Sequence, residues 1–96
     1  MSEAANIINE LAHVILSRKT NAPTGSYTAS LFAQGEDEIV KKVGEEAIEV
    51  IVAAKGQGRE RIVSESADLI YHLLVLLAEK EVAWDEVETE LRKRMK

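Results

Sequence analysis

The chain has 96 residues, of which 46% are hydrophobic and 30% charged, a composition that excludes a disordered chain and a membrane-embedded one. It has no cysteine, which excludes disulfides, thiolate catalysis and cysteine-based zinc sites. No apolar run approaches the roughly 20 residues of a bilayer span, and the first residues lack the basic start of a secretion signal. We therefore expect one domain, residues 1–96, located in the cytoplasm and without a membrane partner.

The net charge of −5 is concentrated in two short motifs. The first acidic motif is Glu45-Glu46-x-x-Glu49, and the second acidic motif is Glu65-x-x-Asp68. The remainder of the chain is electrically balanced. A nucleic-acid surface needs a basic stripe, so we expect no nucleic-acid partner.

The first half of the chain predicts one long helix and one short helix. Apolar residues recur at helical spacing over residues 3–18, where Ser2 is a plausible N-cap. Residues 20–26 contain the only proline and read as a loop. A short helix then begins after Ser26 or Thr28 and is ended by Gly35.

The second half predicts three further helices, over residues 36–55, 59–80 and 84–94, with a break at Gly56-Gln57-Gly58. In the helix over residues 36–55, apolar residues flank the first acidic motif on both sides. This pattern indicates that the helix is enclosed on nearly all sides by its own chain or by a second copy. Gly44 within it indicates either close approach of another backbone or a ligand, or a tolerated defect.

The expected fold is therefore all-α, with four main helices and one short helix. The central pair of helices is apolar on more sides than one short chain can cover. Because exposed apolar patches of that size are rare on monomers, we predict a helical bundle completed by homodimerisation.

The two acidic motifs are expected to face each other, since helices joined by a short loop normally pack antiparallel. Carboxylates gathered in this way repel one another unless a cation lies between them. Oxygen ligands of this kind suit Mg²⁺, with water or phosphate oxygens completing its coordination. A solvated acidic face is the ordinary alternative for a lone Glu-x-x-Glu, but the apolar flanks and the second motif favour a metal site.

Positive side chains near the motifs are candidates for binding phosphate. Lys42 precedes Glu45 by three residues and is the strongest of them, whereas Lys55 and Arg59 lie nearby in sequence. Each could instead be an ordinary surface cation. His72 follows Asp68 by one turn, which predicts a hydrogen bond between the two or, alternatively, a supporting role beside the metal or a phosphate.

The two acidic motifs resemble the signature of the all-α, MazG-type nucleotide pyrophosphohydrolases. Three segments resemble one branch of them, the phosphoribosyl-ATP pyrophosphatases of histidine biosynthesis: Ser-Tyr-Thr at 26–28, Lys-Val-Gly-Glu-Glu-Ala-Ile-Glu at 42–49, and Glu-Ser-Ala-Asp-Leu-Ile-Tyr-His-Leu-Leu-Val-Leu-Leu at 65–77. The resemblance covers residues 7–94.

The resemblance implies Mg²⁺-dependent hydrolysis of 1-(5-phosphoribosyl)-ATP to 1-(5-phosphoribosyl)-AMP and pyrophosphate, carried out by an α-helical dimer. It implies that the metal ligands are Glu46, Glu49, Glu65 and Asp68. Glu45 matches an additional acid that orients or deprotonates water, so Glu45 and Glu46 are the predicted catalytic residues. Because the chain has no room for the cyclohydrolase domain that accompanies some relatives, we expect the free-standing form.

Two rival interpretations remain open at this point. The same metal site would serve hydrolysis of a canonical or damaged dNTP. Alternatively, the chain is a helical dimerisation module whose acids are only a solvated face, and its stability would then not respond to Mg²⁺.

Overall fold

The computed structural model describes residues 3–95, with side chains from residue 7 onward, and these residues form helices joined by short turns. The helices are α1 (Glu3–Asn21), α2 (Tyr27–Gln34), α3 (Glu36–Gly56), α4 (Arg59–Glu79) and α5 (Trp84–Lys93). The described part of the chain contains no strand, which confirms the all-α class and the short second helix. Ser2, the predicted N-cap of the first helix, lies outside the described residues.

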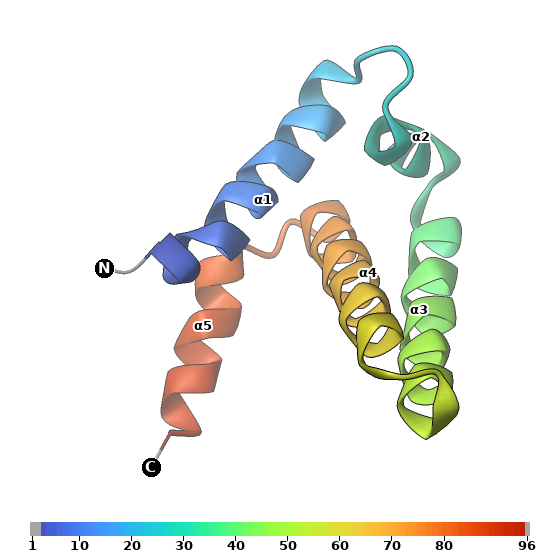
Figure 1. Cartoon of the computed structure of the whole chain (residues 1–96). Coiled ribbons are helices and arrows are strands. Elements are labelled where there is room, and N and C mark those ends of the chain that lie inside the picture. Colours follow the sequence, from blue (N-terminus) through green and yellow to red (C-terminus); the bar gives the residue numbers. More distant parts are fainter. Residues whose placement is uncertain (1–2, 96) are drawn as a thin grey trace.

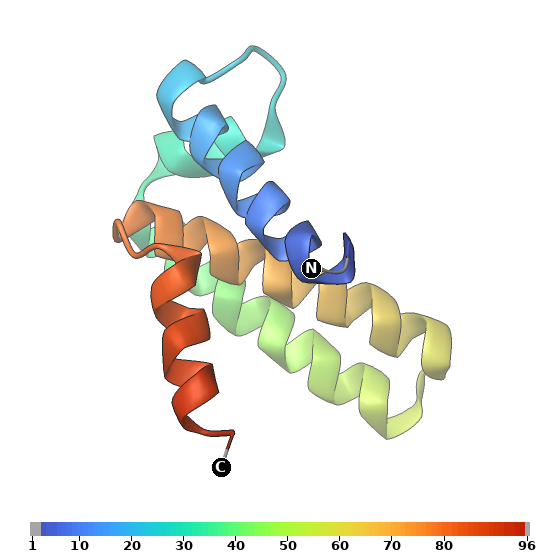
Figure 2. The same ribbon diagram turned by 90° about the vertical axis from the view of Figure 1, so that its left-hand side faces the viewer.

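The centre of the molecule is the antiparallel hairpin of α3 and α4, which pack side by side along their length (Figure 1). Helix α1 crosses α4 on the side away from α3, and α2 packs against both α1 and α3 (Figure 2). Helix α5 extends from the end of α4 and contacts α1. The hairpin therefore has one face covered by α1 and α2, whereas the tip of the hairpin projects beyond them.

The core lies where α1, α2, α3 and α4 meet. Its fully buried side chains are Ile15, Leu31, Ile39, Leu74 and Val75. Phe32 and Trp84, both partly buried, pack against this cluster. Burying an aliphatic side chain of this size contributes about 1.5–3 kcal/mol, so these contacts hold the short helix α2 firmly against the hairpin.

The turn residues explain where the helices begin and end. Of the two candidate caps, it is Ser26 whose hydroxyl accepts a hydrogen bond from the Ala29 amide at 3.1 Å, and Thr28 lies buried in the first turn of α2. Gly35 ends α2 and is also the residue before α3, with φ 98° and ψ 177°, a conformation essentially restricted to glycine. Gly56 is the last residue of α3, and Gln57 occupies the C-cap position.

The outer face of the hairpin carries large apolar side chains that no described part of the chain covers. Ile48 and Ile51 on α3 and Val63 on α4 are each about three fifths exposed, at 60%, 61% and 63%. A Cβ atom at Gly44 would lie more than 4 Å from every described residue that is not its neighbour along the helix, so no other segment of the described chain approaches this glycine closely. Of the two predicted ways of enclosing α3, by its own chain or by a second copy, the described residues therefore do not provide the first. Among the helices of residues 3–95, none has the length and hydrophobicity of a membrane span.

Candidate metal and active site

The hairpin sets the two acidic motifs at matching heights. Because α3 ends at Gly56 and α4 begins at Arg59, residues equally far from this turn lie at about the same level on the two helices. Glu46 is thereby placed opposite Asp68, and Glu49 opposite Glu65. Four residues further from the turn, about 6 Å along each helix, Lys42 lies opposite His72.

The rotation of α3 decides which acid of the first motif faces α4. Glu46 is seven residues from Ile39 and seven from Ala53, and both of these side chains are fully buried. A seven-residue spacing returns to nearly the same side of a helix, so core packing also turns Glu46 towards α4. On α4, Glu65 shares a stripe with the buried His72 for the same reason.

Three carboxylates converge between the two helices. Glu46, Glu65 and Asp68 each present one carboxylate oxygen, and these oxygens lie within 4.8 Å of one another. Glu65 is the most buried, with 5% of its surface exposed, whereas Glu46 is half-buried and Asp68 is exposed. The predicted facing of the two acidic motifs is thus present in the structure.

The two other acids of the first motif lie outside this group. Glu49 is exposed and is not among the converging carboxylates, although its charge contributes to the raised pKa of Glu65. Glu45 is exposed and forms ion pairs with Lys42 at 3.5 Å and Lys41 at 4.0 Å. Both positions are about 60–100° around α3 from Glu46, which accounts for their outward direction.

Glu65 has a positive partner that the sequence interpretation did not name. Burial raises the pKa of Glu65, the adjacent Arg61 guanidinium lowers it, and the charges of the neighbouring carboxylates raise it again. The Arg61 Nη2 atom donates to the Glu65 carboxylate at 2.5 Å. The i, i+4 spacing of this pair on one helix was the signal that could have identified it.

The predicted phosphate-binding cations are not all close to the acidic group. Lys42 approaches Glu46 at 3.8 Å. Burial lowers the pKa of Lys42, but the neighbouring Tyr27, Glu45 and Glu46 outweigh burial and the net shift is upward. Lys55 and Arg59 are exposed at the tip of the hairpin, six residues along their helices from Glu49 and Glu65, respectively.

His72 is buried, and both of its ring nitrogens have partners. Its Nδ1 atom lies 2.7 Å from the backbone carbonyl oxygen of Asp68, so the predicted link between these residues exists but does not involve the Asp68 carboxylate. Its Nε2 atom lies 2.8 Å from the hydroxyl of Tyr27 on α2. Next to this pair, the hydroxyls of Thr28 and Tyr71 are hydrogen-bonded to each other.

Tyr27 is a second residue near the site that the sequence interpretation left unassigned. Burial raises the pKa of its phenol, Lys42 lowers it, and the acidic groups of Glu46, Tyr71 and Asp68 raise it. The phenol is therefore within electrostatic reach of both Lys42 and the converging carboxylates. The only sequence signal was its place in the Ser-Tyr-Thr segment, because nothing in helical periodicity links residues 27 and 72.

The donor set suits a small, hard cation. Mg²⁺ binds oxygen at about 2.0–2.1 Å, so two ligands on opposite sides of the ion are about 4.2 Å apart. The present separation of up to 4.8 Å would have to shrink by about half an ångström. That change is within reach of side-chain rotation, provided that Glu65 exchanges part of its contact with Arg61 for the ion.

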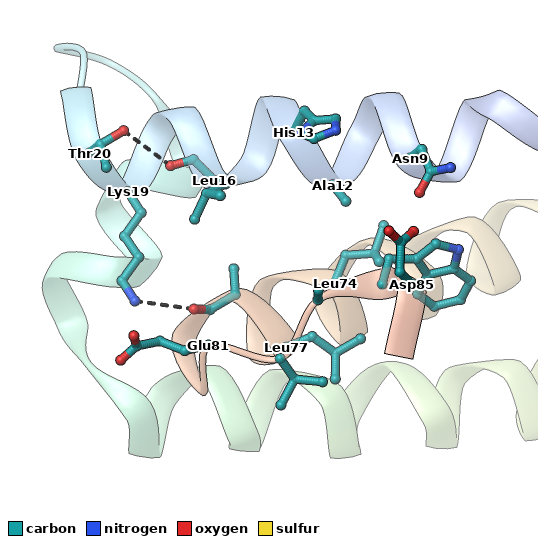
Figure 3. Close-up of a pocket in the computed structure, with 14 residues that line it drawn as sticks. Asn9, Ala12, His13, Leu16, Lys19, Thr20, Leu74, Leu77, Glu81 and Asp85 are labelled. Atoms are coloured by element: carbon teal, nitrogen blue, oxygen red, sulfur yellow. Dashed lines mark hydrogen bonds between the residues drawn. The ribbon is translucent and has the colours of Figure 1, made fainter. Parts of the chain in front are cut away.

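A separate cavity of about 610 Å³ lies between α1, the end of α4 and the start of α5 (Figure 3). Leu16, Leu74 and Leu77 contribute to its mainly apolar wall. Lys19 at its edge donates to the backbone carbonyl of Ala78 at 3.1 Å. None of the three converging carboxylates lines it, so it is not part of the acidic site.

Comparisons with known proteins identify the family of the chain. Residues 8–95 match the family model described as phosphoribosyl-ATP pyrophosphohydrolase. Proteins named phosphoribosyl-ATP pyrophosphatase from Metallosphaera sedula and Pelotomaculum thermopropionicum are each 56% identical to the chain, over 95% and 93% of it and over 98% and 91% of the relatives, respectively. One from Geobacter sulfurreducens is 54% identical over 98% of the chain and 87% of the relative. The chain therefore belongs to the phosphoribosyl-ATP pyrophosphohydrolase family, a family of hydrolases.

Proposed function

We propose that this chain, as a single domain in the cytoplasm, hydrolyses 1-(5-phosphoribosyl)-ATP to 1-(5-phosphoribosyl)-AMP and pyrophosphate with Mg²⁺, the second step of histidine biosynthesis. The observation that carries the proposal is the convergence of Glu46, Glu65 and Asp68 in a chain that belongs to this family. Water supplies the oxygen atom that ends on one phosphorus, and the broken phosphoanhydride releases pyrophosphate.

The ligands proposed for Mg²⁺ are Glu46, Glu65 and Asp68. Glu49, which lies about 60° around α3 from Glu46 and is exposed, is proposed as a fourth ligand whose side chain turns towards the ion when the ion is bound. When bound, the ion supplies charge neutralisation at the phosphate oxygens and lowers the pKa of a bound water. Glu45 has an exposed carboxylate that pairs with Lys42, which also approaches Glu46, and it is proposed to accept the proton of the attacking water. Glu46 is assigned to the ligand set because it points between the helices, whereas Glu45 points outward.

Lys42 is the proposed binding group for phosphate oxygens that the ion does not hold. Its ammonium lies within 4 Å of two carboxylates, which the ion and the reacting water would occupy in the complex. A phosphate would then replace these carboxylates as its partner. Lys55 and Arg59 are proposed to bind the phosphate furthest from the nucleoside, since they lie nearer the tip of the hairpin than Glu49 and Glu65 do.

We also propose that the working form is a homodimer joined through the outer face of the hairpin. The apolar side chains exposed there come from both helices: Ile48, Ile51, Val52, Val63 and Ile70. An apolar surface of this kind is unusual on a monomer and resembles a core that lacks its other half. A second copy would also enclose the outward-facing Glu49, which lies beside this stripe on α3.

Purified protein assayed for pyrophosphate release tests the proposal. The expected result is release from phosphoribosyl-ATP, dependent on Mg²⁺, with phosphoribosyl-AMP as the second product. A panel of canonical and oxidised dNTPs provides the comparison. Faster release from a dNTP than from phosphoribosyl-ATP would reassign the substrate, and no release from any nucleotide, together with no effect of Mg²⁺ on stability, would favour a helical dimerisation module.

A further inference from the structure

The hydrogen bonds around His72 determine the direction in which Tyr27 donates its proton. A carbonyl oxygen can only accept, so the Nδ1 atom of His72, 2.7 Å from the Asp68 carbonyl, carries a hydrogen. In the neutral imidazole the other nitrogen, Nε2, is then an acceptor. The Tyr27 hydroxyl, 2.8 Å from Nε2, therefore donates to it.

This leaves the phenol oxygen of Tyr27 with unused acceptor capacity on a side chain that is held in place. The ring stands edge-on to His72, with centroids 5.8 Å apart and planes at 80°. Tyr27 as a whole is nevertheless 50% exposed, so a ligand can approach this side chain from solvent. The buried imidazole fixes it, because His72 is itself anchored on α4 one turn beyond Asp68.

The position of the phenol relates it to the proposed substrate. Lys42 and His72 lie about 6 Å further from the hairpin turn than Glu46 and Asp68 do. The phenol of Tyr27 lies at this second level, within electrostatic reach of Lys42, Glu46 and Asp68. A nucleotide whose phosphates are bound by Lys42 and the carboxylate site would thus present its adjoining nucleoside part to Tyr27.

Given the proposed function, on which this inference rests, we propose that Tyr27 binds the nucleoside part of the substrate by accepting a hydrogen bond from one of its hydroxyl or amino groups, and that His72 is the positioning residue for Tyr27. An ionised phosphate offers only acceptor oxygens and does not complement an oxygen whose own hydrogen is donated elsewhere. Hydroxyl and amino groups are the donors that a nucleotide carries. Tyr27 thereby selects for the nucleoside, whereas the cations and the metal site bind the phosphates.

The test compares Tyr27→Phe with Tyr71→Phe. Tyr27→Phe keeps the ring against His72 and removes only the hydroxyl. Tyr71→Phe is the matched control, since its hydroxyl also joins α4 to α2, through the buried Thr28, but is not bonded to His72. Both variants leave one buried polar group without its partner, so both are expected to lower the melting temperature.

Only Tyr27→Phe is expected to change nucleoside recognition. Its KM for phosphoribosyl-ATP and its inhibition constant for phosphoribosyl-AMP should both rise, by roughly three- to tenfold as for one lost hydrogen bond. Its kcat and its inhibition constant for pyrophosphate should stay at the wild-type values, since pyrophosphate has no nucleoside. Tyr71→Phe should leave all four quantities unchanged.

Three results would overturn the inference while leaving the proposed reaction intact. They are an unchanged KM in Tyr27→Phe, an equal rise of KM in the two variants, and a rise in the inhibition constant for pyrophosphate that matches the rise in KM. Failure of the proposed function is recognised separately, because the wild-type protein would then release no pyrophosphate from phosphoribosyl-ATP.

The role of His72 is tested by a double-mutant cycle with His72→Phe, a substitution of similar size that removes both ring nitrogens. If His72 acts on the substrate through Tyr27, the double variant has the same KM as Tyr27→Phe alone. If the two effects on KM multiply instead, His72 acts independently of Tyr27 and the positioning role is wrong. The inhibition constant for pyrophosphate again serves as the control that neither variant should change.

Discussion

Glu46 and Asp68 are separated by 22 positions in the sequence, yet their carboxylates share one group with Glu65 between α3 and α4. Each acid lies on the same side of its helix as fully buried residues, Ile39 and Ala53 for Glu46 and Val75 for Asp68. The packing that stabilises the hairpin therefore also places the acids. A substitution that removes charge but keeps shape should affect activity much more than folding.

Glu46→Gln and Asp68→Asn are accordingly expected to lower kcat by at least about 100-fold at saturating Mg²⁺, because each removes a proposed ligand. Circular dichroism and the elution volume should match those of the wild type. Glu90→Gln, which removes an exposed, ion-paired carboxylate on α5, is the control and should keep full activity. Near-wild-type turnover in either of the first two variants would show that the ligand assignment is wrong.

Arg61 holds Glu65 in the absence of metal and should compete with a cation for it. In Arg61→Gln the buried Glu65 loses its positive partner, so the metal-free protein should melt at a lower temperature than the wild type. Added Mg²⁺ should raise the melting temperature of this variant by more than it raises that of the wild type. Arg92→Gln breaks an exposed i, i+4 pair with Glu88 and should change neither quantity. Equal Mg²⁺ responses in Arg61→Gln and wild type would mean that Arg61 does not oppose metal binding.

The raised pKa of Glu65 makes the stability of the metal-free protein depend on pH. The folded state binds more protons than the unfolded state between pH 4.5, the ordinary value, and the higher folded pKa, so stability falls as pH rises through that window. Urea titrations from pH 4 to pH 8 should show this fall in wild type relative to Glu65→Gln. Saturating Mg²⁺ should reverse the trend, because the ion binds the deprotonated carboxylate. A pH profile identical in both proteins would contradict this account of Glu65.

The outer face of the hairpin should govern the oligomeric state. Ile51→Lys places a charge in the middle of the proposed interface and should convert a dimer into a monomer at micromolar concentration, as measured by sedimentation velocity. Met95→Lys, at a highly exposed position near the end of the chain, is the control and should leave the sedimentation coefficient unchanged. A wild-type protein that sediments as a folded monomer would end the dimer proposal.

The bounds of α2 to α5 could be predicted almost to the residue, because periodicity, glycines and caps are local signals, whereas α1 runs to Asn21, three residues past its predicted end and into the predicted loop. The starts of α3 and α4 at Glu36 and Arg59 were expected from the preceding Gly35 and Gly58. The convergence of the two acidic motifs also followed from local information, since a short turn leaves two helices only one simple way to pack.

Contacts between distant segments could not be predicted in this way. The Tyr27–His72 bond joins residues 45 positions apart and depends on where the core places α2. The separation of Glu49 from the converging group depends on how far α3 is rotated, which the burial of Ile39 and Ala53 decides. Composition and spacing alone specify neither the placement of α2 nor the rotation of α3.

The relative position of Tyr27 and Lys42 depends on the backbone of one residue, Gly35. One residue ends the helix that carries the tyrosine and begins the helix that carries the lysine, so one pair of dihedral angles sets the corner between them. Any residue with a Cβ atom would be strained at these angles, and relief of the strain would change the distance between the Tyr27 phenol and the Lys42 ammonium although neither side chain is altered. The backbone of Gly35 therefore sets the spacing between the two side chains proposed to bind the nucleoside and the phosphates of the substrate.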